Sequence, residues 1–114
     1  MPRLIACLAV LIALAAAGCG GGGGGSATVL KTGDVVSMKS LHFHPDHVQV
    51  KVGQPVTWRN DEGVPHNVVA KSGADFESKT FGKDSTFSYT PGQAGTIKYE
   101  CTLHPGMEGT LTVQ

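Results

Sequence analysis

The feature that most constrains this chain is a strict alternation of apolar and polar residues in short runs. The runs are Val48 to Val52, Val56 to Trp58, Phe87 to Tyr89, Ile97 to Cys101 and Leu111 to Val113. Turn-forming Gly, Pro, Asn and Asp residues separate them, and no stretch of useful length has helical periodicity. Period-two runs of this length predict strands with one buried face. We therefore expect an all-β fold, an antiparallel Greek-key sandwich of about seven or eight strands.

The N-terminus has a different composition and is not expected to belong to the sandwich. Arg3 precedes the apolar run Leu4–Ala17, whose 14 residues are too few to span a membrane and suit the core of a signal peptide. Small residues then lead directly to Cys19, as in a bacterial lipoprotein processing site, although Ala16 replaces the usual leucine. We expect residues 1–18 to be a lipoprotein-type signal peptide and Cys19 to carry the lipid. The alternative is ordinary cleavage near the same point, and either route exports the protein.

The mature chain is then expected to be periplasmic or otherwise extracytoplasmic, and anchored to a membrane. The glycines Gly20–Gly25 predict a flexible coil, so we expect residues 19–33 to tether a domain formed by residues 34–114. Loss of Arg3 with the signal leaves eight Lys and Arg (nine minus one) against nine Asp and Glu. No basic stripe is present, which argues against nucleic acid as a partner. We expect a monomer.

Cysteine usage singles out one thiol in the domain. Cys7 leaves with the signal and Cys19 takes the lipid, so Cys101 is the cysteine that the domain keeps. An exported domain with a lone thiol and no disulfide needs a chemical reason for that thiol. The alternation with Ile97 and Tyr99 directs Cys101 inward, which on its own also fits a small buried apolar residue.

Three further residues favour a metal site. His104 and Met107 follow Cys101 at three-residue spacing in a turn-forming loop, which can bring three side chains to one point. His66, 35 residues upstream, opens a predicted strand that can begin at the same end of a sandwich. A thiolate, two imidazoles and a thioether suit a soft, redox-active ion and point to copper. Structural zinc prefers four strong ligands, and a thioether is a poor one.

These motifs resemble those of the cupredoxin family. The segments that carry the resemblance are VKVGQPVTWRNDEGVPHNVV, residues 50–69, and YECTLHPGMEGTLTV, residues 99–113. The resemblance runs from about Asp34 to the C-terminus. The short Cys-x2-His-x2-Met loop is more similar to that of amicyanin than to those of plastocyanin or azurin. Leu103 and Gly106 depart from the amicyanin pattern, in which proline and a bulkier residue are usual.

The resemblance implies a type 1 (blue) copper electron carrier. Its ligands would be His66, Cys101, His104 and an axial Met107, holding one copper ion that cycles between Cu(I) and Cu(II). Such a protein passes single electrons between a redox donor and acceptor, whose identities the sequence leaves open. By the same resemblance Asn67 hydrogen-bonds near the thiolate and tunes the site. His104 would reach the surface through an apolar rim formed by Pro65, Leu103, Pro105 and Met38.

Other copper proteins fit less well. A multicopper oxidase flanks its cysteine with histidines, whereas Glu100 and Thr102 flank Cys101, and a binuclear purple-copper loop needs two cysteines. A chain this short has no substrate-binding elaboration, so we do not expect an enzyme. A copper chaperone or storage protein stays open, although such proteins usually carry several methionines. A third hypothesis is a related domain that has lost its copper. The presence of all four potential ligands argues against it.

Three more histidines lie before a predicted strand and are not needed by the copper site. His42 and His44 could share a face, and His47 follows closely. A second metal site is one interpretation. The sequence alone favours the other, in which these are solvated histidines near the start of a strand.

Overall fold

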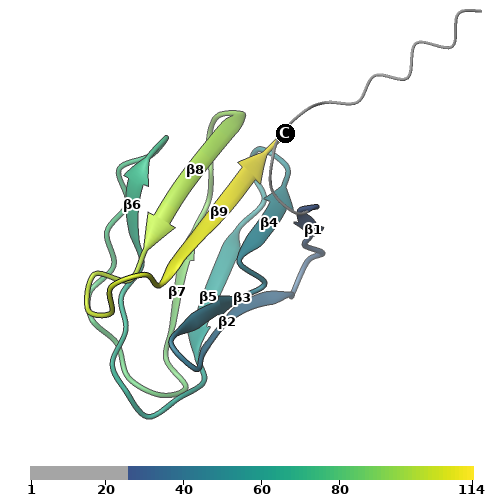
Figure 1. Ribbon diagram of the computed structural model, residues 1–114. Helices are drawn as coiled ribbons and strands as arrows, with labels where there is room; N and C mark the ends of the chain where they lie inside the picture. The colour runs from purple at the N-terminus through teal and green to yellow at the C-terminus, as the bar shows by residue number, and fades with distance from the viewer. Residues whose placement is uncertain (1–25) are drawn as a thin grey trace, which may run out of the picture.

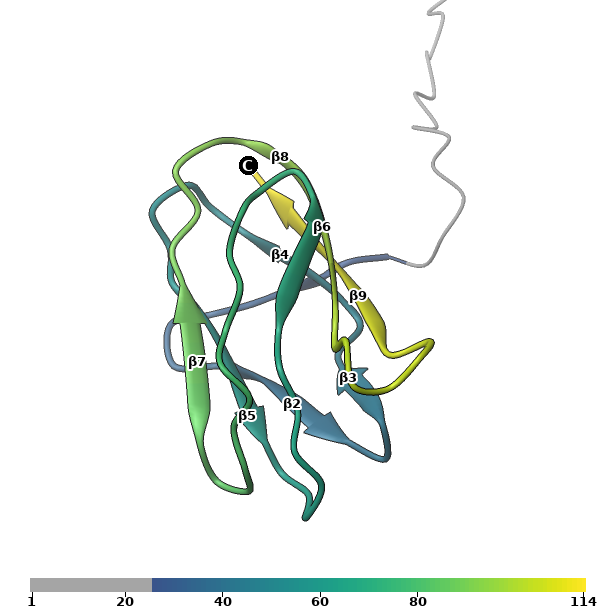
Figure 2. The ribbon, with the colours of Figure 1, turned by 90° about the vertical axis from the view of Figure 1, so that its left-hand side faces the viewer.

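The computed structural model describes residues 26–114, which form nine strands in two facing sheets and no helix (Figures 1 and 2). The strands are β1 (Thr28–Val29), β2 (Val35–Lys39), β3 (His42–His44), β4 (His47–Val50), β5 (Val56–Asn60), β6 (Val69–Ser72), β7 (Thr86–Tyr89), β8 (Gly95–Glu100) and β9 (Glu108–Val113). The expected signal peptide and Cys19 lie outside the described residues. Among residues 26–114 there is no helix that could cross a membrane.

The two sheets are mixed. One has the strand order β1-β4-β9-β8-β6 and the other β3-β2-β5-β7. β4 runs parallel to both β1 and β9, and β2 runs parallel to β5, whereas the remaining neighbours are antiparallel. The expected all-β sandwich is confirmed, with nine strands where about seven or eight are expected, and its sheets are mixed rather than purely antiparallel. Alternation reports which face of a strand is buried and not the direction of its neighbour, so it could not decide this point.

Two expected strand boundaries are also wrong. β4 ends at Val50, and Val52 lies in the following turn with 46% of its surface exposed. The strand expected to open at His66 begins at Val69, and His66 itself forms an isolated bridge with Phe81. The connection between β6 and β7 is long, as expected, and carries Phe76 and Phe81 against the core.

The core lies between the sheets and is built from the inward positions of the alternating strands. Its buried members are Leu30, Val36, Met38, Phe43, Val48, Val50, Val56, Trp58, Val68, Ile97, Tyr99, Cys101, Met107, Leu111 and Val113. Trp58 is at its centre, with ring contacts to Tyr99 and Phe87. Side chains of this size bury enough apolar area to stabilise a small single domain.

The first described residues pack onto the sandwich. β1 pairs with β4, Leu30 is buried, and the Leu30 N–H donates to the carbonyl of Gln49 at 3.0 Å. Packing against the sheet therefore begins at Thr28, inside the segment that the sequence assigns to the tether.

Loops from distant parts of the chain meet at one end of the molecule. The β8–β9 loop and the β5–β6 connection lie side by side there, as both views show (Figures 1 and 2). Two hydrogen bonds between Asn67 and Thr102 join them. The C-terminus lies at the other end of β9. The end with the two loops holds most of the predicted site.

Candidate metal centre

The β8–β9 loop, residues 101–107, is closed by its own backbone. The Cys101 N–H donates to the carbonyl of Met107 at 3.0 Å, and the Met107 N–H donates to the carbonyl of His104 at 3.1 Å. Gly106 turns the loop with a φ of 87°, a region that glycine enters without steric cost. This backbone explains why glycine stands where a bulkier residue is usual. It also holds the three predicted ligands of the loop close together.

A buried asparagine shapes the connection that carries His66. The Asn60 side chain donates to the carbonyls of Val64 and Phe81, at 2.8 and 3.1 Å, and accepts from the N–H of Glu62. His66 is held in turn by two backbone hydrogen bonds with Phe81. These bonds replace the strand that the sequence predicts here, and they fix the direction of the imidazole.

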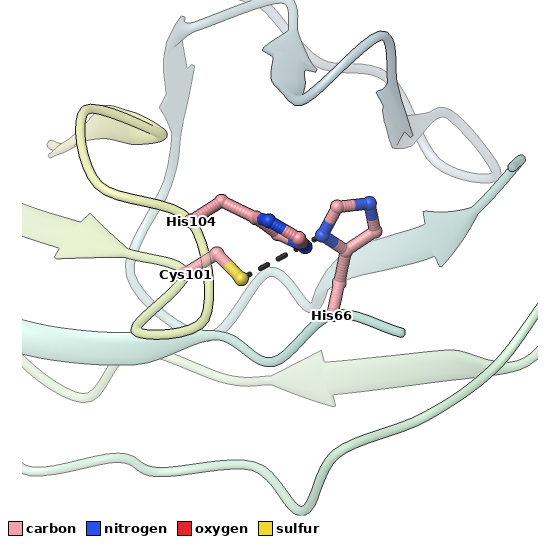
Figure 3. A group of neighbouring side chains, drawn as sticks. All are labelled: His66, Cys101 and His104. Carbon is pink, nitrogen blue, oxygen red and sulfur yellow. Dashed lines mark hydrogen bonds between the residues drawn. The ribbon is translucent and has the colours of Figure 1, made fainter. Parts of the chain in front are cut away.

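The side chains of His66, Cys101 and His104 point toward one another (Figure 3). One ligand atom from each lies within 4.8 Å of the other two. Cys101 Sγ is 3.6 Å from His66 Nδ1, and the two imidazole centroids are 4.8 Å apart. His66 and Cys101 are buried, with 0% and 2% of their surfaces exposed, whereas His104 is partly exposed. The structure thus brings three of the predicted ligands to one point.

These separations fit a metal ion. A sulfur and a nitrogen that bind one ion at about 2.3 and 2.0–2.1 Å, at a tetrahedral or trigonal angle, lie roughly 3.5–3.8 Å apart. The distance between Cys101 Sγ and His66 Nδ1 is 3.6 Å. Met107, the predicted axial ligand, is buried and is tied to Cys101 and His104 through its backbone. A buried thiolate with two imidazoles is a donor set that copper accepts well.

Glu62 orients the imidazole of His66. Its Oε1 lies 2.6 Å from His66 Nε2. An ionised carboxylate only accepts hydrogen bonds, so Nε2 of a neutral His66 carries the proton and its Nδ1, which faces Cys101, keeps a lone pair. Metal-binding histidines commonly use their second nitrogen in this way, because the hydrogen bond sets both the tautomer and the ring direction.

The same carboxylate also holds the β2–β3 turn. Glu62 accepts from the N–H groups of Ser40 and Leu41, at 2.7 and 3.1 Å, and both residues have positive φ. Burial opposes the ionisation of Glu62, but the hydrogen bonds from Leu41, His66 and Ser40 outweigh it and lower the pKa of the carboxyl. The sequence did not predict this role. Glu62 stands in a segment that reads only as a turn, and its partners are set by tertiary contacts.

Asn67 joins the two site loops and hydrogen-bonds beside Cys101, in keeping with the resemblance. Its amide donates to Thr102 Oγ1 at 2.7 Å, and its Oδ1 accepts from the Thr102 N–H at 2.8 Å. Asn67 therefore bonds to the residue after Cys101, and these bonds hold Cys101 in register with His66.

His104 lies at the edge of the site, beside apolar groups. Its Nε2 is 3.1 Å from the carbonyl of Pro65, and Pro65, Leu103 and Pro105 are all exposed. Met38, the fourth expected member of the rim, is fully buried in the core. The expectation that Met38 belongs to the rim is wrong. Met38 occupies an inward position of β2, so its side chain points into the core between the two sheets.

The structure separates His47 from the other two histidines outside the site. His42 and His44 lie on β3, in one sheet, whereas His47 begins β4 in the other and hydrogen-bonds Thr112 Oγ1 at 3.1 Å. None of the three belongs to the cluster around Cys101.

A two-sheet sandwich with a buried thiolate and two imidazoles at one end defines a class of protein, the copper-binding electron carriers. The chain belongs to the plastocyanin/azurin family of copper-binding proteins, whose sequence profile matches residues 30–114. Its cofactor is one copper ion, Cu(I) or Cu(II).

Relatives of known identity support the assignment. Amicyanin of Paracoccus denitrificans is 37% identical over 93 residues, covering 78% of this chain and 71% of the relative. Plastocyanin of Scenedesmus fuscus is 38% identical over 90 residues, covering 66% and 89%. A reduced tryptophan-to-tyrosine mutant of amicyanin superposes with a TM-score of 0.68 at 34% identity, covering 75% of this chain and 86% of that one.

Proposed function

We propose that His66, Cys101, His104 and an axial Met107 hold the copper ion, and that through it the protein passes single electrons between redox proteins. The observation that carries this proposal is the convergence of a buried cysteine sulfur and two imidazoles within 4.8 Å. When bound, copper supplies one-electron chemistry by alternating between Cu(I) and Cu(II). We propose an electron carrier and not an enzyme.

The residues of the chain keep the site rigid during electron transfer. Cys101 and His66 are buried, and the bonds of Asn67 and Glu62 hold them from either side. A site whose ligands are preorganised by hydrogen bonds and packing needs little rearrangement when the charge of its ion changes. Low rearrangement is the physical requirement for fast electron transfer.

His104 is the proposed route for electrons to and from the surface. It is the most exposed of the three converging ligands, and exposed Pro65, Leu103 and Pro105 surround it. A small apolar patch suits the weak, short-lived encounters that are typical of redox partners. The partner chemistry is therefore that of another redox protein with a complementary apolar surface.

We further propose that the mature protein is a membrane-anchored lipoprotein outside the cytoplasm. In this proposal residues 1–18 are removed, Cys19 carries the lipid and residues 19–33 link it to the domain 34–114. Thr28–Leu30 pack on the sandwich, so the free part of the tether is shorter than 15 residues. The proposal is supported by the small residues before Cys19. Metabolic labelling with palmitate tests it, and equal labelling of a Cys19→Ser variant contradicts it.

Spectroscopy of the copper-loaded protein tests the electron-carrier function. We expect an intense visible absorption band in the Cu(II) form that disappears on reduction and returns on oxidation, because a thiolate ligand gives blue copper its colour. Cys101→Ser is expected to lose the band, whereas Ser72→Ala, on an exposed strand end, keeps it. A colourless protein that binds only Cu(I) would instead indicate a copper chaperone or storage protein.

A further inference from the structure

Two histidines stand side by side on the outer face of an edge strand. β3 is the first strand of its sheet, and Phe43 points into the core from its middle position. His42 and His44 occupy the alternate positions and are both exposed. Side chains two residues apart on a strand share one face. Their imidazole centroids are 6.1 Å apart.

This spacing suits two imidazoles on one metal ion. At nitrogen–metal distances of about 2.0–2.1 Å, two bound rings have centroids roughly 4.5 Å apart at a right angle and about 6.4 Å apart when opposite. The observed 6.1 Å falls inside this range. Both side chains are exposed, so their rings can rotate to reach either arrangement.

A hydrogen bond to the backbone already holds the ring of His44 in an orientation suited to metal binding. His44 Nε2 lies 2.9 Å from the backbone carbonyl of Lys39. A carbonyl oxygen can only accept, so Nε2 of a neutral His44 carries the proton and Nδ1 keeps its lone pair. Histidine ligands of metals typically donate their second N–H to a carbonyl or carboxylate in this way. His66 has the same arrangement with Glu62 in the buried centre.

We propose that His42 and His44 form a second metal site, on the surface, which binds one exchangeable divalent ion of borderline softness such as Zn²⁺ or Cu²⁺. Imidazole suits both ions. Water completes the coordination, since the three-ligand cluster found among residues 26–114 is the buried one around Cys101. Lys39 is the cross-strand neighbour of His42, and its ammonium opposes a cation there. The site is therefore weaker than the buried one, and its ion exchanges.

Calorimetric titration of the tag-free, copper-loaded mature protein with Zn²⁺ tests the proposal. We expect one further ion per molecule. His42→Asn and His44→Asn should each weaken the binding of this further ion at least about tenfold. Loss of a residue that only supports a metal ligand already costs about that much affinity, and loss of the ligand itself should cost no less. Lys39→Gln should strengthen binding by roughly two- to fivefold, the range of an exposed charge interaction. The matched control is His47→Asn, which removes an imidazole from the other sheet.

Electron paramagnetic resonance with added Cu²⁺ gives a second readout. We expect a new signal, distinct from that of the buried centre, which the double His42→Asn, His44→Asn variant lacks. The visible band of the buried centre should stay unchanged in every variant, which shows that each is folded. Three results would overturn the proposal: no second ion in the unaltered protein, a second ion that survives the double substitution, or an equal loss in His47→Asn.

Discussion

Glu62 connects the buried His66 to a hairpin that lies more than 20 residues away in the sequence. Its carboxylate bonds to the imidazole and to the N–H groups of Ser40 and Leu41. Both turn residues have positive φ, which is unfavourable for a side chain such as leucine. At the scale of single residues, one carboxylate thus supports both a metal ligand and a strained turn.

Glu62→Ala is expected to weaken both the fold and copper binding. The substitution leaves the N–H groups of Ser40 and Leu41 and the Nε2 of His66 without their acceptor. We expect a loss of about 1–3 kcal/mol in the free energy of unfolding of the copper-free protein. Copper affinity should fall by about 10- to 100-fold, as for other residues that support a metal-binding histidine.

Denaturant unfolding and copper titration measure the two effects of Glu62→Ala. The matched control is Glu77→Ala, which removes an exposed carboxylate that does not belong to the cluster of His66, Cys101 and His104. Equal copper affinity in the two variants would contradict the role of Glu62 at the site.

At the scale of elements, the pairing of β8 with β9 places the ring of Tyr99 directly over Gly109. The two residues are cross-strand partners, and the Tyr99 ring covers the glycine. A Cβ at position 109 would overlap the carbon and oxygen atoms at the end of that ring. Position 109, the second residue of β9, is occupied by glycine because the neighbouring aromatic ring leaves no space for a side chain.

Gly109→Ala is therefore expected to destabilise the protein. Overpacking of a filled core costs about 1–3 kcal/mol, and the ring that must shift stands two residues before Cys101. Thermal unfolding should show a lower midpoint, with a broadened or shifted visible band if the displacement reaches the site. Gly92→Ala is the control, because a Cβ there meets open space. A midpoint unchanged from the parent protein would show that Tyr99 relaxes freely.

At the scale of the whole molecule, stability depends on the protonation of a group in the core. Burial raises the pKa of Tyr99 to about 12. The nearby indole N–H of Trp58 partly offsets this rise. Neither that N–H nor the Tyr99 hydroxyl has a partner in hydrogen-bond geometry, so burial is the main cause. The folded state thus keeps a proton that the unfolded chain, with an ordinary tyrosine pKa of about 10, releases.

The free energy of unfolding should consequently fall at alkaline pH. The contribution of Tyr99 is complete below pH 10 and is lost as pH rises toward 12, because the unfolded state binds fewer protons in that window. At about 1.4 kcal/mol per pKa unit, the loss approaches 2–3 kcal/mol. Denaturant unfolding at a series of pH values measures it. Tyr99→Phe should flatten the dependence, and an equally steep fall in that variant would contradict the assignment.

Removal of copper is expected to lower the stability of the whole sandwich. The proposed ligands come from segments 35 residues apart, and the unfolded chain does not hold them together. Free copper at 100 times its dissociation constant adds about 2.7 kcal/mol to the folded state. Thermal midpoints with copper and after chelation measure this, and Cys101→Ser should show a much smaller difference. Identical midpoints for the parent protein would contradict the proposed site.

Much of the fold and site could be predicted because both leave local patterns. Alternation placed Trp58, Ile97 and Tyr99 in the core, and the same phase directed Cys101 inward. The spacing of Cys101, His104 and Met107 predicted a tight inter-strand loop, and two backbone hydrogen bonds close such a loop. Such features depend on side-chain period and loop length, which are properties of neighbouring residues.

Other features could not be predicted from neighbouring residues. Alternation identifies the buried face of a strand but not its partner, so the parallel pairs β2–β5 and β4–β9 were missed. The period-two pattern also continues to Val52, although β4 ends at Val50. Alternation does not record where hydrogen bonding to the neighbouring strand stops.

By itself, the sequence determined the all-β class, the burial of Cys101 and the residues available to bind copper, because these follow from the order of side chains along short segments. Only the tertiary structure decided which of them meet. It brought Glu62 between His66 and the β2–β3 turn, moved Met38 from the expected rim into the core, and turned His42 and His44 outward together. Contacts between residues so far apart depend on how the two sheets pack, and no local pattern encodes that packing.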